Sequence, residues 1–476
     1  MSTGLLNEPL ERSAPPPVPS PFRAPAILAA SGAVVAAVLF WIVSGSLTDD
    51  AYISLSAARN LAVHGEWAIV NGLTANTSTS PLNVLVLGAL TFLTRLWGPG
   101  DPLFALGMLN VAVTALLGWV LARTCRRLGL GTVWAVLAGA LVVFNPFVLS
   151  AVGLEVLLIP AAVAVMVWFA LEGRAAWFGA AAGMASLVRL DLLVFVVVIA
   201  ALSPAIRTQL RRALAGFAAI AGPWYLFSWI VLGSALPDTF LIKQGQASDV
   251  GGYNYLTGPI MYFESNPWRT VAAFGPAALA LVLILVALAS YARPGKRPVP
   301  VPLLALGLSG ALYYAAYVVL DTVPYHWYYV APATTLAMFA VLAAGIHWSA
   351  ARNATDRAVA GTLAGLLAVL GAGAVYYDVE SGLPWDAPPI FGNWASAQDY
   401  ERVGRAVGTL VGEAPVRSPV RSGPSRTSVN ASSSTNSPTA DWWSRTGWCP
   451  VSRRPPNRRA HCCARTTPSS TTGSHP

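Results

Sequence analysis

An acidic pair, Asp49 and Asp50, stands directly after the first long apolar run, residues 25–47. Carboxylates at the edge of a membrane span are costly, so they usually face water, a partner or a substrate. From Ala51 to Val63, apolar side chains recur at helical spacing, with Arg59, Asn60 and His64 on the exposed polar side, which predicts an amphipathic helix in the membrane interface. The alternative is a solvated loop that merely ends the first span. The pair and the helix together favour a built site, in which a carboxylate accepts a proton or binds a cation.

Other charged and polar residues fall between apolar runs or at their ends. They are Glu155, Arg189, Asp191, Lys243, His326 and Tyr328. Each has an ordinary structural explanation: a glutamate favours a helix N-terminus, an arginine and a nearby aspartate can pair, and a loop lysine is solvated. A histidine among tyrosine and tryptophan residues can pack in the aromatic belt of a membrane protein. Their convergence on one predicted face is a better indication of a site than any one residue.

The composition is that of a protein crossing a membrane several times. Of the 476 residues, 55% are hydrophobic and 11% are charged, and the mean hydropathy is +0.57. Many apolar runs approach the roughly 20 residues that span a bilayer. The runs lie near 25–47, 82–97, 103–122, 132–149, 153–172, 175–188, 191–203, 213–232, 270–291, 301–320, 328–347 and 358–376. We expect an all-α polytopic membrane protein, preceded by a proline-rich cytoplasmic leader at 1–24.

Arginine and lysine clusters predict the topology, because they mark cytoplasmic loops. They occur at 123–127, 174, 207–212, 293–297 and 352–357. With a cytoplasmic N-terminus and an extracytoplasmic C-terminus, these clusters fit about eleven crossings if the run 82–97 is re-entrant or juxtamembrane. The runs 175–188 and 191–203 are also short, and a single crossing made of both would change this count. The plasma membrane is the expected location.

This topology assigns the polar segments to the outer side. The first outer loop is 48–81 and a long outer loop is 233–268, with shorter outer segments near Glu155, near Arg189 and at 321–327. Residues 377–416 form an extracytoplasmic segment, and the transmembrane domain is 25–376.

Three motifs in and after the first outer loop resemble the corresponding loop of GT-C glycosyltransferases. They are TDDAYI at 48–53, AARNLAVHGEW at 57–67 and STSPLNVL at 78–85. The likeness is closest to actinobacterial arabinofuranosyl- and mannosyltransferase-like proteins and covers roughly residues 25–400. It implies a GT-C-like fold and an inverting transfer of sugar from a polyprenyl-phosphate donor to an extracytoplasmic cell-envelope acceptor.

The resemblance also implies roles for the acids. Such a transfer needs a base for the acceptor hydroxyl and cations for the leaving phosphate, while the transition state is oxocarbenium-like. Asp50 is the expected base, with Asp49 as the second candidate. Glu155 would orient the acceptor or share a divalent metal with Asp50; no cofactor is certain.

The expected substrate-binding residues follow from the same likeness. The segment LPDTFLIK, ending at Lys243, resembles an LPNT-x-x-x-K motif, although Asp238 replaces the asparagine. Lysine is a compact charge suited to a phosphate. Relatives carry Arg-Pro-Asp where this chain has Arg189 and Asp191 around Leu190. His326 and Tyr328 are further candidates for contacts with phosphate or sugar.

Two other classes of function compete with this interpretation. A transporter or a lipid or sugar flippase has about as many helices, but usually shows internal repeats and broken helices at the midplane. A non-catalytic scaffold would not need the paired acids. Nucleic-acid binding is not indicated: the net charge of +9 arises mainly in residues 417–476, which hold nine arginines and one acid, Asp441. Four cysteines, three of them in that tail, indicate no disulfide framework or zinc site.

The composition changes abruptly after Pro415 to arginine, serine, threonine and proline. A chain with so few aliphatic residues cannot offset its ordering entropy, so we expect residues 417–476 to be disordered. The tail is either a natural low-complexity segment or the product of a frameshift in a GC-rich gene, and we favour the frameshift.

Overall fold

The computed structural model describes residues 23–239, 250–291 and 299–390, single helical residues at 402, 406, 409 and 410, and two short strands. Its first half contains α1 (Arg23–Val43), η1 (Ser44–Ser46), α2 (Asp49–His64), α3 (Pro81–Thr94), α4 (Pro102–Leu128), α5 (Thr132–Val143), α6 (Pro146–Leu149), α7 (Leu158–Glu172), α8 (Ala175–Val188), η2 (Leu190–Leu192), α9 (Leu193–Leu202) and α10 (Pro204–Arg207). The second half contains α11 (Leu210–Val231), α13 (Gly258–Ser265), α14 (Pro267–Tyr291), α15 (Val301–Val319), α16 (His326–Ala350) and α17 (Ala354–Glu380).

Seven of the described helices are long and apolar enough to cross a membrane. They are α1 with η1, α4, α11, α14, α15, α16 and α17. Shorter apolar helices are α3, α5, α7, α8 and the stretch Leu190–Leu202. At 1.5 Å per residue, a helix of 25 residues such as α16 rises about 37 Å, more than the roughly 30 Å of a hydrocarbon core. The chain is therefore a mainly α-helical, multi-pass membrane protein, as its composition predicts.

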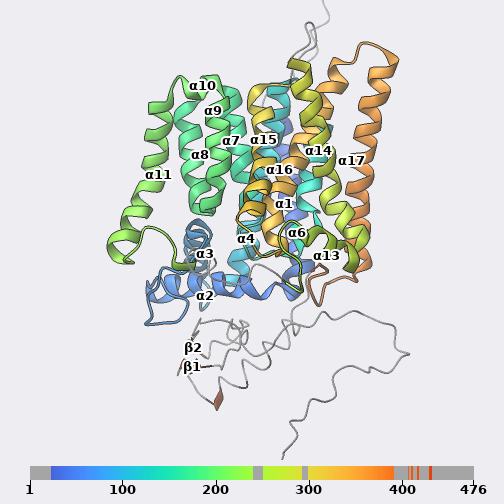
Figure 1. Ribbon diagram of the computed structural model, residues 1–476. Helices are drawn as coiled ribbons and strands as arrows, with labels where there is room; N and C mark the ends of the chain where they lie inside the picture. Colours follow the sequence, from blue (N-terminus) through green and yellow to red (C-terminus); the bar gives the residue numbers. More distant parts are fainter. Residues whose placement is uncertain are drawn as a thin grey trace, which may run out of the picture.

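The long helices stand side by side, and α16 lies inside the bundle (Figure 1). Every residue in the apolar window of α16 is buried, whereas α1 and α11 bury only 11% and 17% of theirs. Helix α16 packs against α14, α15, α5 and α17. The peripheral helices turn apolar side chains outward, which is stable only where lipid surrounds them. The centre of the bundle is thus packed against other helices, whereas its perimeter presents an apolar surface suited to contact with lipid.

Helices α8 and α11 approach closely because glycines line their contact. A Cβ at Gly179 would overlap the carbonyl oxygen of Ala213, and one at Gly216 would overlap that of Ala176. Gly183 lies four residues after Gly179 and also faces α11. Small residues at this spacing let the backbones of membrane helices meet. This contact fixes the short α8 against the long α11.

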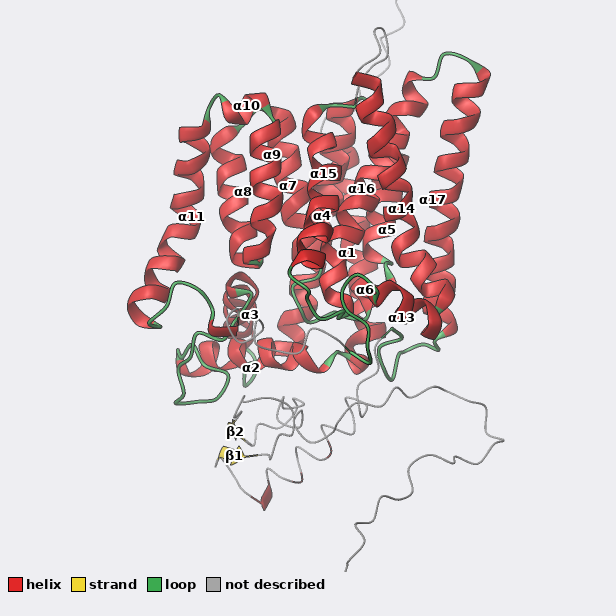
Figure 2. Ribbon diagram, in the orientation of Figure 1, coloured by secondary structure: helices red, strands yellow, loops and turns green. Residues whose placement is uncertain are grey.

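Helix α2 lies across one end of the bundle (Figure 2), which we call the α2 end; the opposite end, where α10 lies, is the α10 end. The observed α2 agrees with the helix expected from Ala51 to Val63 but is longer, and its place in the membrane interface stays a prediction. Asn60 differs from the expectation of an exposed polar face: it is buried, and its Nδ2 donates to the carbonyl oxygens of Ala68 (3.0 Å) and Ile69 (2.9 Å). The amide thereby holds the chain that leaves α2.

Helix α3 packs along α2, in the place where sequence predicted a re-entrant or juxtamembrane segment at 82–97. A Cβ at Gly88 would meet the side chain of Leu61 at 2.8 Å, and Arg95 donates from Nη1 to the carbonyl oxygen of Ala62 at 2.9 Å. Its 14 residues rise about 21 Å, less than a hydrocarbon core. The contacts at its middle and end therefore bind it to the interfacial helix.

After α17, the chain returns across the α2 end. The backbone N–H of Trp385 donates to the carbonyl oxygen of Ile42 (3.0 Å), and that of Ile390 donates to Ser150 Oγ (3.3 Å). Residues 1–22 of the predicted leader and 391–400 of the predicted outer segment lie outside the described residues.

Most of the predicted tail also lies outside the described residues. Arg417 belongs to β1 (Pro415–Arg417), which pairs antiparallel with β2 (Ser428–Asn430). Disorder and a frameshift in this tail therefore stay predictions.

Candidate functional site

The acidic pair begins α2. Thr48 is the N-cap residue, and Asp49 Oδ1 accepts hydrogen bonds from the backbone N–H of Asp50 (3.1 Å) and from Thr48 Oγ1 (3.4 Å). Burial, and then the charge of Asp50, raise the pKa of Asp49 to about 8. Asp49 therefore holds a proton at neutral pH, because desolvation and a neighbouring like charge both disfavour its ionised form. The charge that acts on Asp49 is that of Asp50, the carboxylate expected from the sequence to accept a proton.

The start of α16 meets the start of α2 through Tyr325. Burial, the charge of Asp50, Tyr328 and the charge of Asp49, in that order, raise the pKa of Tyr325 to about 12. Tyr325 is the N-cap residue of α16 and stacks on Trp327, with 4.6 Å between the ring centroids. The acids and the tyrosine come from segments about 275 residues apart, and their electrostatic coupling places both at one site.

The loop from Ser150 to Leu157 lies against the first turn of α2. Gly153 has a φ of +105°, and a Cβ there would overlap the Cβ of Ala51. Only glycine combines this backbone conformation with so close an approach. A glycine at position 153 therefore allows the loop that carries Glu155 to lie directly against Ala51, the residue next to Asp50.

Glu155 is tied to Arg189 and, through it, to Asp191. Arg189 Nη1 donates to Glu155 Oε1 at 2.7 Å, while Nε and Nη2 donate to the Asp191 carboxylate at 3.0 and 2.6 Å. The side chains of Arg189, Glu155 and Asp191 are 11%, 8% and 22% exposed. Charge-assisted bonds of this kind offset the cost of burying ions. We call these three residues the Arg189 network.

Three tyrosines complete the Arg189 network, and sequence reasoning identified only Tyr328. Tyr313 donates to Asp191 Oδ2 at 2.9 Å, and Tyr317 donates to the same oxygen. Tyr317 also accepts from Arg189 Nη2 at 3.0 Å, and the guanidinium lies 5.4 Å from the Tyr328 ring centroid. The four-residue spacing of Tyr313 and Tyr317 predicts that both lie on one face of a helix. It does not predict that this face contacts Arg189 and Asp191.

The Arg189 network combines two carboxylates with one guanidinium, so its formal charge is negative. An anionic phosphate gains little from a cation whose charge is already matched by Glu155 and Asp191. The expected structural pairing of Arg189 and Asp191 is observed, and it extends to Glu155. The contacts favour a positioning role for these residues over direct binding of a phosphate.

His326 lies fully inside the bundle. Its Nε2 is 3.3 Å from the carbonyl oxygen of Ser150, and its ring meets Phe147 edge to face at 6.1 Å. Ser150 begins the loop that carries Gly153 and Glu155. The histidine therefore fixes this loop to α16, which is the packing alternative that the sequence left open.

The described part of the predicted long outer loop, 233–268, is anchored to α16 by tyrosines. Tyr255 stacks on Tyr329 with 4.3 Å between ring centroids, Tyr329 Oη donates to the carbonyl oxygen of Tyr255 at 2.6 Å, and Tyr262 Oη donates to that of Pro324 at 2.7 Å. These contacts hold residues 250–265 beside the start of α16. Sequence reasoning missed them, since they depend on partners about 70 residues away.

Lys243, the expected phosphate ligand, lies outside the described residues. The segment before it is held by Asn76, whose Nδ2 approaches the carbonyl oxygens of Ser234 (2.8 Å) and Leu236 (2.9 Å). The backbone N–H of Asp238 donates to the carbonyl oxygen of Asn76 at 2.8 Å. Asp238 thus contributes its backbone here, at the position where the motif that the segment resembles has an asparagine.

A divalent metal shared by Asp50 and Glu155 has limited support. Within the described ranges, no three His, Cys, Asp or Glu side chains gather as a metal site would need. Glu155 Oε1 is bonded to Arg189. This donor set does not fit a metal held by the protein alone.

No protein-family model, curated protein or solved structure matches the chain. The fold is that of a multi-pass helical membrane protein, and the helix α2 at one end of its bundle begins with two acidic residues.

Proposed function

We propose that this chain is a GT-C-like glycosyltransferase of the plasma membrane. It transfers a sugar from a polyprenyl-phosphate donor to a cell-envelope glycan outside the membrane, with inversion at the anomeric carbon. The observation that carries the proposal is the start of α2: Asp50 lies at the mouth of a span, on an interfacial helix, beside the start of the buried α16.

The proposed topology has about eleven crossings, with α3 lying beside α2 without crossing. Described arginines gather at the α10 end, in the turns after α4 and α16 and in the segment from α10 into α11, which supports a cytoplasmic α10 end. The N-terminus then lies in the cytoplasm, and the α2 end faces outward together with the C-terminal segment.

In the proposed reaction, Asp50 takes the proton of the acceptor hydroxyl as that oxygen attacks the anomeric carbon. The bond from this carbon to the phosphate oxygen breaks, and the phosphate leaves with the electron pair. Because Asp49 is protonated at neutral pH, Asp49 and Asp50 together carry a single negative charge. Lys243 neutralises the phosphate, while the Arg189 network holds the loop of Glu155 in place.

A transporter or flippase is the second candidate, favoured by the charged Arg189 network in the interior of a membrane protein. The site is otherwise gathered at one end of the bundle, where an outward-facing enzyme needs it.

Reconstituted vesicles distinguish the two candidates. The chain is supplied with radiolabelled polyprenyl-phosphate arabinose or mannose and an envelope glycan fraction. An enzyme moves label into the glycan, and Asp50→Asn stops this, whereas the matched variant Asp386→Asn at the same end does not. Label that crosses the bilayer without entering glycan would favour transport.

A further inference from the structure

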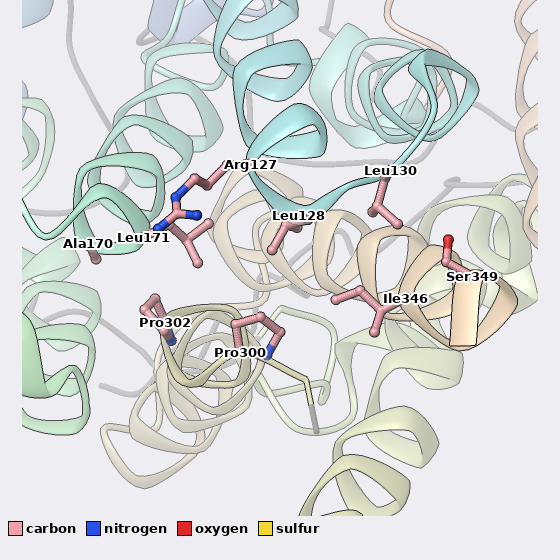
Figure 3. A pocket seen from close by; sticks show the side chains of 9 residues that line it. All are labelled: Arg127, Leu128, Leu130, Ala170, Leu171, Pro300, Pro302, Ile346 and Ser349. Carbon is pink, nitrogen blue, oxygen red and sulfur yellow. The ribbon is translucent and has the colours of Figure 1, made fainter. Parts of the chain in front are cut away.

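The cavity that the described residues form most clearly lies at the α10 end, away from the acids. It has a volume of about 340 Å³ and lies among the ends of α4, α7 and α16 and the start of α15. Figure 3 shows its lining: Arg127, Leu128, Leu130, Ala170, Leu171, Pro300, Pro302, Ile346 and Ser349. The volume is within the range of small-ligand pockets.

The lining combines one cation and one hydroxyl with apolar walls. Arg127 supplies the charge, and its only ion pair within the described residues is a long one, 3.7 Å from Nε to Glu172 Oε1. Both Nη atoms thus have capacity for another acceptor. A guanidinium binds phosphate oxygens through two parallel hydrogen bonds.

The surroundings of the cavity favour an anion. The described arginines at the α10 end are Arg23, Arg123, Arg126, Arg127, Arg174, Arg207, Arg211, Arg212, Arg352 and Arg357, against the acids Glu172 and Asp356. The carbonyl ends of α4 and α7, which would repel an anion, are capped: Gly129 and Gly173 donate to the carbonyl oxygens of Arg126 and Ala170. The local field is therefore set by the arginines.

We propose that this cavity binds the phosphate headgroup of an anionic phospholipid. The phosphate would bind Arg127 at one end of the lining, and the glycerol and first acyl carbons would extend along Leu171 and Ile346 toward Ser349 at the other end. Basic pockets between helices, at the level of the headgroups, are suited to such lipids. The phosphate chemistry is shared with free phosphate, but the apolar walls favour the lipid.

Lipid retention by the whole protein tests this proposal. The chain is reconstituted with equal phosphatidylglycerol and phosphatidylcholine, extracted into detergent and weighed by native mass spectrometry. We expect about one retained phosphatidylglycerol, and roughly tenfold weaker retention by Arg127→Gln. Arg357→Gln, which removes an exposed arginine at the same end outside the cavity, should retain the lipid like the parent. Ser349→Phe fills the cavity from its exposed rim and should also lose it, with an unchanged melting temperature.

Three outcomes would overturn the proposal. They are equal retention of both lipids by the parent chain, undiminished phosphatidylglycerol in Arg127→Gln, and displacement of the lipid by millimolar inorganic phosphate, which would assign the cavity to free phosphate. None of these measurements uses sugar transfer, so they are independent of the proposed enzyme activity.

Discussion

Two groups of carboxylates at the α2 end are held in opposite electrostatic settings. Asp49 and Asp50 stand beside each other and beside Tyr325, so that the pKa of Asp49 is raised by burial and by its neighbour's charge. Glu155 and Asp191 share the guanidinium of Arg189, and Asp191 accepts from two tyrosines. The first group is suited to exchanging protons, whereas the second is satisfied by its own contacts. Acids at the same end of the bundle can therefore have different roles, and the residues that contact them decide which. Asp49 and Asp50 form the group suited to chemistry, whereas Glu155 and Asp191 form the architectural group, which holds the structure together.

The largest expected effect separates the two groups by activity. Asp50→Asn keeps the shape of the side chain but removes the base, so we expect sugar transfer to fall by about 10²–10⁴-fold. Transfer of label from the donor into glycan measures this, with the melting temperature in detergent as the check on folding. Retained turnover would move the role of base to Asp49 or Glu155.

Removal of Arg189 should test the architectural group. Arg189→Gln leaves two buried carboxylates without their cation, so we expect a loss of about 3–5 kcal/mol in the free energy of unfolding. Denaturant unfolding in mixed micelles measures it. Adding Glu155→Gln and Asp191→Asn to the same chain should recover most of the loss. No recovery would mean that Arg189 acts by its packing and not by its charge.

Gly153 connects the two groups. Gly153→Ala forces a Cβ against Ala51 at a φ of +105°, and we expect a cost of about 1–3 kcal/mol with reduced transfer. Gly72→Ala is the control, because Gly72 has a φ of +77° but nothing near its Cβ position. If both substitutions lowered the free energy of unfolding equally, the close approach of Gly153 to α2 would not explain the effect.

The pH dependence of stability should come from the first group. The folded-state pKa of Asp49, about 8, lies above its ordinary value of 3.8, so its stabilising contribution is full below pH 4 and is lost as the pH rises from 4 to 8. Asp49→Asn removes this dependence, and the difference between the two chains should change by at most about 1.4 kcal/mol per pH unit. Melting temperatures from pH 5 to 9 measure it, and parallel curves would contradict a raised pKa.

The smallest expected effect concerns the tyrosines of the Arg189 network. Tyr317→Phe removes the hydroxyl shared by Asp191 and Arg189, and we expect a loss of about 1 kcal/mol in unfolding free energy. Tyr376→Phe, an exposed tyrosine on α17, is the matched control. A loss as large as that of Arg189→Gln would make the tyrosine, and not the arginine, the centre of the network.

Local sequence predicted the elements that depend on neighbours in the chain. The interfacial helix and the position of α3 were expected from apolar spacing and length, and the pairing of Arg189 with Asp191 from their separation by two residues. The links of Arg189 to Glu155 and Tyr317 were not, because these partners are 34 and 128 residues away. Asn60 was misassigned to the exposed face, since its burial depends on the chain that folds back beneath α2.

The return of the chain after α17 has a consequence for biosynthesis. The loop that carries Glu155 is bonded through Ser150 to Ile390, and the end of α1 is bonded to Trp385. A ribosome adding about 5–20 residues per second reaches these partners roughly 10–50 s after it has made Ser150. The early spans of the nascent chain are therefore inserted before these contacts can form. The region around the acids closes only when the segment after α17 has been made. A change of reading frame downstream of Ile390 leaves this late closure intact.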